Sequence, residues 1–279
     1  MTDETGTLPD ETGIGRVALT VGDANDTAEF YETVVGLTVQ ARRDDRVVLG
    51  DGETALVELH EDPEAPERSR RSAGLFHTAF RVPSRAALGD ALERVDAEWQ
   101  LSGASDHLVS EALYCRDPEG NGVEIYRDRP RAEWNETPDG GVEMATEQLD
   151  TAGVRADATG ARTVPEGTDV GHVHLEVTSL DAARAFYVDA LGMNVRTTYD
   201  GALFLAAGDY HHHVGANVWN GRTDPASGRG LAWFELVLPD AGAVEAATDR
   251  LSAAGYEVAS AGEAATVTDD DGITLRLRA

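Results

Sequence analysis

The chain has 279 residues, enough for two ordinary domains that each bury a core. It carries 51 acidic residues against 23 basic ones, which are all arginine, and its formal net charge is -28. A surface of this charge repels nucleic acid and anionic membranes, so we expect neither as a partner.

The same charge predicts a halophilic protein. Acidic side chains repel one another in dilute buffer, whereas at molar salt the screening length falls to roughly 3 Å. The lone Cys115 cannot form an internal disulfide, and the N-terminus lacks the basic start and apolar run of a secretory signal. No apolar stretch approaches the roughly 20 residues that span a bilayer, so we expect a cytoplasmic protein.

The first structural module begins after residues 1–12, for which we predict a disordered acidic tail. "GRVALTVGDANDTAEFYETVVGLTV", from Gly15, predicts a half-alternating strand followed by a helix that stops at Gly36. "DRVVLGDGETALVELHE" follows as short strands broken by Gly and Asp. The order is therefore β-α-β-β-β.

A second module begins at Gly74 with "GLFHTAFRVPSRAALGDALERV". Ser84 stands where a helix N-cap belongs, and the apolar residues that follow repeat at i, i+3, i+4 and i+7. Strand-like runs continue to Pro130. The two modules predict an N-terminal pair over 13–130.

A connector is predicted over 131–168, because this stretch is rich in Gly, Pro, Asp and Thr. Within it we expect one short helix, from Met144 to Leu149. After it, "GHVHLEVTSLDAARAFYVDALGMNV" aligns without gaps on the segment from Gly15, and "GLAWFELVLPDAGAVEAATDRL" aligns on the segment from Gly74. A C-terminal pair of modules is therefore predicted over 169–279, with Asp240 as a further N-cap.

Four β-α-β-β-β modules, with "FYETVVGL" and "FYVDALGM" ending their first helices, resemble the vicinal oxygen chelate superfamily. This superfamily includes glyoxalase I, bleomycin and other antibiotic resistance proteins, and extradiol dioxygenases. The resemblance implies an α+β fold in which four βαβββ modules form two cupped half-barrels. A metal ion, when present, lies in a cup.

One segment, "SDHLVSEALYCRDPEGNGVEIYRDRP", is similar to the signature of the type I extradiol, catechol 2,3-dioxygenase-like enzymes. It carries His107, Tyr114 and Glu124 in the order of that signature. The resemblance implies that His107 and Tyr114 contact the substrate and that Glu124 is an iron ligand.

Metal-binding members of the superfamily carry one ligand near the start of a first strand and another on a last strand. If module two pairs with module three, His77, His172 and Glu124 share one cup. Two imidazoles and one carboxylate are the donor set of non-heme iron(II) oxygenases, so we predict this pairing. A separation of His77 and His172 above about 10 Å would contradict it, since ligand bonds are near 2 Å. The other cup would then contain Arg16, Trp233 and Thr274.

Three consecutive histidines, His211 to His213, stand where the extradiol enzymes carry an acid–base histidine on the last strand of module three. On a strand, adjacent side chains point to opposite faces, so the three cannot all serve one site. We predict His212 as the proton-transfer residue, with His213 as the alternate. A histidine pKa near 6.5 suits this role at neutral pH.

The predicted function is extradiol cleavage of a small aromatic diol by O2 at an Fe(II) site, with Mn(II) as the alternative ion. Two other functions stay open: a glyoxalase I-like divalent-metal lyase or isomerase, and a small-molecule-binding protein without catalysis. The glyoxalase reading would pair neighbouring modules and use Glu58 with His77 and Glu124. Whether the chain forms a homo-oligomer is left open.

Overall fold

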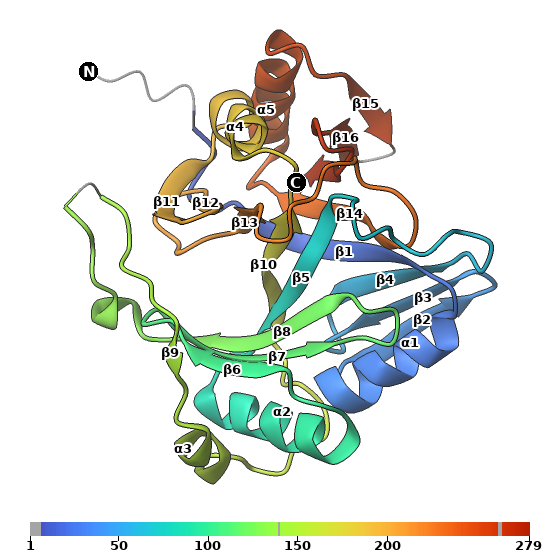
Figure 1. Cartoon of the computed structure of the whole chain (residues 1–279), viewed down its shortest axis with the longest axis vertical. Coiled ribbons are helices and arrows are strands. Elements are labelled where there is room, and N and C mark those ends of the chain that lie inside the picture. The colour runs from blue at the N-terminus through green and yellow to red at the C-terminus, as the bar shows by residue number, and fades with distance from the viewer. Residues whose placement is uncertain (1–6, 139, 262–263) are drawn as a thin grey trace. The chain divides into compact units, whose positions relative to one another are not determined.

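The computed structural model describes residues 7–138, 140–261 and 264–279 (Figure 1). The chain divides into two compact units. The N-terminal unit comprises Arg16–Pro66 and His77–Gly171, and the C-terminal unit comprises His172–Ala279, Glu67–Phe76 and the residues up to Gly15. The module boundaries at 13–130 and 169–279 stay a prediction.

The N-terminal unit is built from two βαβββ modules. In each, the first strand pairs in parallel with the last, and the remaining strands add in antiparallel order, giving β1-β4-β3-β2 and β5-β8-β7-β6. Helix α1 lies against β3 and β4, and α2 lies against β7 and β8 (Figure 1). The elements are β1 Gly13–Val21, α1 Ala24–Phe30, η2 Tyr31–Val35, β2 Thr38–Arg43, β3 Arg46–Gly50, β4 Ala55–Glu61, β5 Gly74–Arg81, α2 Arg85–Glu98, β6 Gly103–Asp106, β7 Ser110–Arg116 and β8 Gly122–Asp128.

The C-terminal unit repeats the design, with strand orders β10-β13-β12-β11 and β14-β17-β16-β15. The α+β fold with four βαβββ modules is therefore confirmed. The elements are β10 Asp169–Glu176, α4 Leu180–Ala183, η4 Arg184–Ala190, β11 Asn194–Tyr199, β12 Ala202–Ala206, β13 Val214–Asn217, β14 Gly230–Val237, α5 Ala241–Ala253, β15 Val258–Ala261, β16 Ala264–Thr268 and β17 Thr274–Arg278.

The helix boundaries predicted at Gly36, Ser84 and Asp240 are confirmed. The side chains of Ser84 and Asp240 accept hydrogen bonds from the backbone N–H groups of Ala87 and Ala243, as N-caps do. The first helix of module one ends at Gly36, whose φ of 89° lies in the left-handed region that glycine adopts without strain.

A buried tyrosine–aspartate hydrogen bond joins the two modules of each unit. The Tyr31 hydroxyl donates to Asp117 at 3.4 Å, and the Tyr187 hydroxyl donates to Asp269 at 2.9 Å. Both tyrosines belong to the repeated Phe-Tyr motif, and both aspartates lie in the turn before a last strand. Burial raises the pKa of each aspartate, in each case to about 6.

The connector differs from its prediction. No helix forms over residues 144–149, where Glu147–Gln148 form the short strand β9 instead. β9 pairs with Ser105 and Asp106 of β6, a partner far away in the sequence. The connector also contains η3 Arg131–Glu133 and α3 Thr151–Ala156.

Part of the predicted disordered tail is ordered in the structure. Residues 1–6 lie outside the described residues. Leu8 and Thr12 are both 2% exposed, and the Leu8 N–H donates to the Gly192 carbonyl at 2.9 Å. Leu8 and Thr12 are therefore packed, because apolar Leu8 gains by leaving water, whereas Thr7, Asp10 and Glu11 are exposed.

Candidate functional site

The centre of the candidate site is a histidine–glutamate pair on two parallel strands. Ala79 of β5 is in register with Glu124 of β8, and His77 lies two residues before Ala79, on the same face of its strand. The Nε2 atom of His77 is 3.0 Å from Oε2 of Glu124. His77 is 6% exposed and Glu124 2% exposed, so the pair is shielded from water.

His172 completes the set. One donor atom of each of His77, Glu124 and His172 lies within 4.8 Å of the donors of the other two. His172 is 2% exposed. Of the described His, Cys, Asp and Glu side chains, these three make up the group whose donors are close enough to share an ion.

Strand β10 places His172 through contacts that lie inside the N-terminal unit. Its first residues belong to that unit, and there Asp169 accepts hydrogen bonds from Arg81 of β5. A Cβ at Gly171 would meet the Tyr126 hydroxyl of β8 at 1.8 Å, so only glycine fits this approach. β5 and the first residues of β10 belong to this unit, and the two strands are neighbours in the strand order.

Tyr114 lies opposite Glu124 in the antiparallel pair of β7 and β8. Burial, together with the Glu124 carboxylate, raises the pKa of Tyr114 well above its usual range. Its hydroxyl is 2.7 Å from Nε2 of His107, whose Nδ1 is 2.6 Å from the Ala145 carbonyl oxygen. Because a carbonyl only accepts, Nδ1 of His107 carries a proton.

The turn that carries His107 is held in an unusual conformation. Leu108, the next residue, has a φ of 69°, a conformation that costs free energy in a non-glycine residue. The Asp106 side chain accepts the Leu108 N–H, and the His107 N–H donates to the Ser110 carbonyl. These bonds fix the direction in which the imidazole leaves the turn.

His211, His212 and His213 do not lie on a strand, contrary to the prediction. They form the bend between β12, which ends at Ala206, and β13, which begins at Val214. The alternation rule therefore does not apply to them. All three are buried, at 0%, 5% and 8% exposure.

His212 and His213 have different contacts in this bend. The His212 ring centroid is 4.1 Å from that of His172. The Nδ1 atom of His213 instead accepts the Ala207 N–H at 3.2 Å, and its ring stacks on Tyr210. His212 is thus the residue beside the candidate ligand, while His213 is engaged with the backbone.

Glu58, the carboxylate of the glyoxalase-like alternative, has other partners. Arg46 donates to it at 2.9 Å, Arg16 donates at 3.4 Å, and His60 Nε2 lies at 2.8 Å. The hydrogen bond with His60, aided by the arginines, lowers the pKa of Glu58 to about 2. Glu58 is therefore a member of an ion-pair cluster in module one.

In module four, the position that corresponds to Glu124 holds a different residue from the one expected. Glu235 of β14 is in register with Arg276, so Arg276, and not Thr274, corresponds to Glu124. The Arg276 guanidinium lies over the Trp233 ring, 3.8 Å from its centroid. Sequence alignment alone misplaced this position by two residues, because strand register depends on the pairing partner.

The model of the Glyoxalase/Bleomycin resistance protein/Dioxygenase superfamily matches residues 13–125 and 169–277. The chain belongs to this superfamily. A catechol-2,3-dioxygenase from Bacillus subtilis (strain 168) is 39% identical over 262 residues, covering 90% of this chain and 91% of the relative.

Solved structures of the superfamily share the fold. A putative dioxygenase from Bacillus subtilis has a TM-score of 0.65 at 14% identity, covering 97% of this chain and 85% of its own. A glyoxalase I mutant from Zea mays has a TM-score of 0.60 at 17% identity, covering 96% of this chain and 92% of its own.

None of the helices in the described part of the chain has the length and apolarity needed to cross a bilayer.

His174 is surrounded by aromatic side chains. This residue is 3% exposed, and its ring centroid lies 5.3 Å from Phe76, 5.5 Å from Phe204 and 5.3 Å from Trp219. Alternation along β10 places it on the face of His172. The aromatic residues around it come from three separate segments, so only the tertiary structure assembles them.

The sequence did not predict the ion pairs of Glu176, farther along β10. Arg222 donates to this buried carboxylate at 2.7 and 2.9 Å, and Arg68 also pairs with it. Arg68 belongs to the loop between β4 and β5. Because a buried carboxylate needs charged partners, Glu176 holds that loop against the strand that carries His172.

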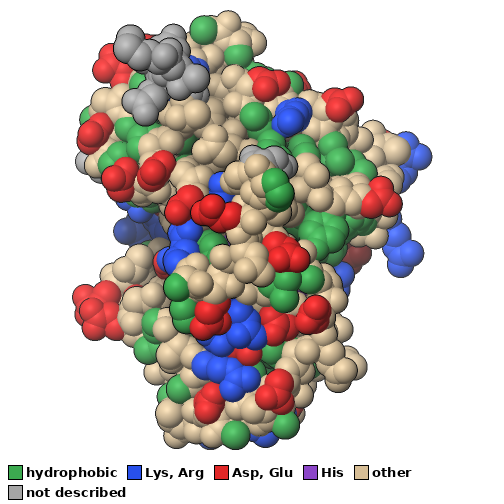
Figure 2. All heavy atoms as spheres, turned by 90° about the vertical axis from the view of Figure 1, so that its left-hand side faces the viewer, with side chains coloured by type: hydrophobic (Ala, Val, Ile, Leu, Met, Phe, Trp, Pro, Cys, Tyr) green, Lys and Arg blue, Asp and Glu red, His purple; other side chains and the backbone are tan. Residues whose placement is uncertain are grey.

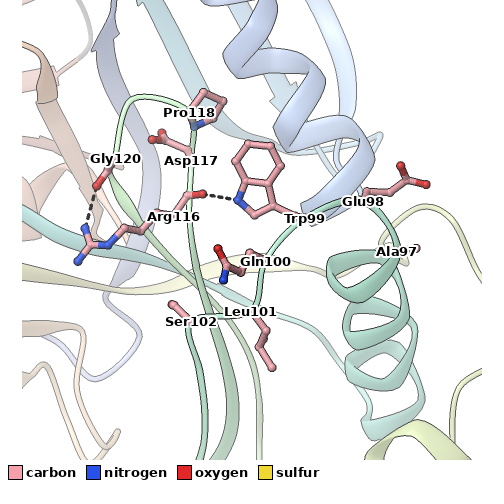
Figure 3. Close-up of a pocket in the computed structure, with 10 residues that line it drawn as sticks. All are labelled: Ala97, Glu98, Trp99, Gln100, Leu101, Ser102, Arg116, Asp117, Pro118 and Gly120. Atoms are coloured by element: carbon pink, nitrogen blue, oxygen red, sulfur yellow. Dashed lines mark hydrogen bonds between the residues drawn. The ribbon is translucent and has the colours of Figure 1, made fainter.

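A hollow of about 910 Å³ lies elsewhere in the N-terminal unit (Figure 3). The Trp99 indole N–H donates to the Arg116 carbonyl at 2.7 Å on its wall. It contains no predicted site residue, so it does not form part of the candidate metal centre. Its lining residues are Ala97, Glu98, Trp99, Gln100, Leu101, Ser102, Arg116, Asp117, Pro118 and Gly120.

Proposed function

We propose that this protein is an extradiol ring-cleaving dioxygenase that opens a catechol-type aromatic diol with O2 at a 2-His-1-carboxylate iron(II) site. The convergence of His77, His172 and Glu124 within 4.8 Å carries this proposal. The 39% identity to a relative named catechol-2,3-dioxygenase supports it.

The donor set fits the metal. Ligand atoms about 2 Å from one ion lie roughly 3–4 Å apart, so donors within 4.8 Å reach that spacing by small side-chain movements. Two imidazoles and one carboxylate on one side of an ion leave positions open for a diol and O2. Mn(II) accepts the same donors, and metal analysis decides between the two ions.

Iron(II) bound here would bring diol and O2 together and carry charge between them. The remaining work belongs to the protein. His212, beside His172, takes a proton from a diol hydroxyl and later returns one. A buried imidazole can do this because water does not compete for the proton.

His107 and Tyr114 orient the substrate. Their mutual hydrogen bond of 2.7 Å and the bond from His107 to the Ala145 carbonyl hold both groups in one arrangement. Tyr114 stays protonated at neutral pH because its pKa is raised, so its hydroxyl keeps a proton to donate. It therefore acts as a hydrogen-bonding group and not as a base.

The test is oxygen consumption by protein purified without air at high KCl and loaded with Fe(II) or Mn(II). With catechol, we expect O2 uptake and a ring-opened product that contains both oxygen atoms, measured with an electrode and by mass spectrometry. Metal binding without O2 uptake would favour the lyase or isomerase class. If the protein binds the diol but binds no metal and consumes no O2, the result would favour a small-molecule-binding protein without catalysis.

A further inference from the structure

His211 and His212 form a histidine pair in the bend before β13. Their Nδ1 atoms are 2.7 Å apart, within hydrogen-bond distance. Each neutral imidazole has one N–H and one lone pair, so one ring donates and the other accepts. The bond is buried, since His211 is 0% and His212 5% exposed.

The stacking around His211 fixes this ring in place. Its centroid lies 4.1 Å from that of Tyr210, with an angle of 33° between the planes. It also lies 5.9 Å from the His172 ring centroid, with the two rings edge to face. A ring held by both neighbours presents its Nδ1 in one direction, so it can set the orientation of His212.

We propose that His211 is a positioning residue that holds His212 in one plane and one tautomer, with the proton on Nδ1 of His212 and the lone pair on its Nε2. This inference rests on the proposed function, in which His212 accepts a proton from the diol. His212 can accept at Nε2 only if its single proton lies on Nδ1. Donation of that proton to Nδ1 of His211 selects this form, as a carboxylate does for histidine in hydrolytic triads.

The other nearby histidines do not serve this role. His213 has its Nδ1 bonded to the Ala207 N–H, and the His174 ring centroid is 6.5 Å from that of His212. His211 is therefore the neighbour that engages Nδ1 of His212 directly.

Two substitutions separate hydrogen bonding from packing. H211N keeps an oxygen acceptor close to the place of Nδ1. H211F keeps an aromatic ring against Tyr210 but has no acceptor. H60N is the matched control, because His60 is a partly buried histidine in the ion-pair cluster of Glu58, outside the site.

The first readout needs neither metal nor turnover. In metal-free protein with ¹⁵N-labelled histidine, NMR reports which ring nitrogen carries the proton. We expect His212 protonated at Nδ1 in wild type, H211N and H60N, and a mixture of tautomers in H211F. A wild-type His212 protonated at Nε2 would overturn the proposal. This test uses wild-type protein alone, so it remains decisive even if H211F does not fold.

The second readout is the kinetics of the reconstituted enzyme. For H211F we expect kcat to fall about 10- to 100-fold, with KM within about twofold and metal content unchanged. H211N should stay within about threefold of wild type. Equal loss in H211N and H211F, or no loss in H211F, would also overturn the proposal. If wild type consumes no O2 with any diol, the proposed function fails while the NMR result still decides the histidine pair.

Discussion

Arg16 donates to Glu58 at 3.4 Å in module one, at the register positions that His77 and Glu124 occupy in module two. An arginine is permanently charged, so it neutralises the carboxylate without an ion. Neutral imidazole does not, and a carboxylate beside it can still bind a cation. Arginine in place of histidine thus belongs to an ion-pair cluster, which Arg46 and His60 complete, where module two has a candidate metal centre.

The ion pairs of Glu58 should appear in the pH dependence of stability. Its pKa is lowered from 4.5 to about 2, chiefly by the hydrogen bond with His60, so its contribution is complete above pH 4.5 and is lost as the pH falls toward 2. We expect E58Q to lower the free energy of unfolding at pH 7 by about 1–3 kcal/mol, allowing for the partly exposed arginines. The deficit should narrow below pH 4.5, measured by denaturant unfolding at several pH values. A deficit independent of pH would contradict this account.

Replacing Glu124 should remove metal binding, because one of three donors and the negative charge are lost. We expect E124A to bind less than about a tenth of the wild-type metal, measured by elemental analysis after reconstitution. E58A alters the corresponding position of module one and serves as the control, with metal content near that of wild type. Full metal content in E124A would exclude Glu124 as a ligand.

H212F should separate metal binding from turnover. The imidazole is lost while an aromatic ring remains beside His172, so we expect iron content to be kept. Loss of an acid–base group lowers kcat by about 10²- to 10⁴-fold, measured as O2 uptake at saturating diol. Unchanged kcat with unchanged iron would move the proton-transfer role to another residue.

The stability contributions of Asp117 and Asp269 should depend on pH in the opposite direction to that of Glu58. Burial raises both pKa values from 3.8 to about 6, so their contribution is present below pH 3.8 and is lost as the pH rises through 6. We expect the double variant D117N/D269N to lose less stability than wild type between pH 4 and 7. The measurement is denaturant unfolding across this range, with exposed Asp270, replaced by Asn, as the control. Equal losses in all three proteins would rule out these two carboxyl groups.

Stability should rise with salt. Acidic side chains are spread over the face in Figure 2, and the net charge of -28 makes their repulsion strong at low ionic strength. We expect the free energy of unfolding to increase between low and molar KCl, measured by thermal or denaturant unfolding. Sucrose of equal osmolality controls for effects unrelated to charge. A stability that is flat in KCl would remove the expectation of halophilic behaviour.

The sequence by itself determined the modules. Their strands and helices follow from short-range patterns: apolar alternation, caps such as Ser84, and the glycine at position 36 that ends a helix. The gapless internal repeat gave the number of modules, and it aligned His172 with Arg16 and Trp233 with His77 as first-strand positions. These features are local, so they are readable without knowing what each strand pairs with.

The tertiary structure decided which local features meet. It brought His172 within reach of His77 and Glu124, and it exchanged Thr274 for Arg276 as the register partner of module four. The predicted connector helix became strand β9, and the three histidines became a bend in which His211 meets His212. Each outcome depends on hydrogen bonds or packing between segments far apart in the chain. The free energy of these long-range interactions cannot be predicted from local sequence patterns.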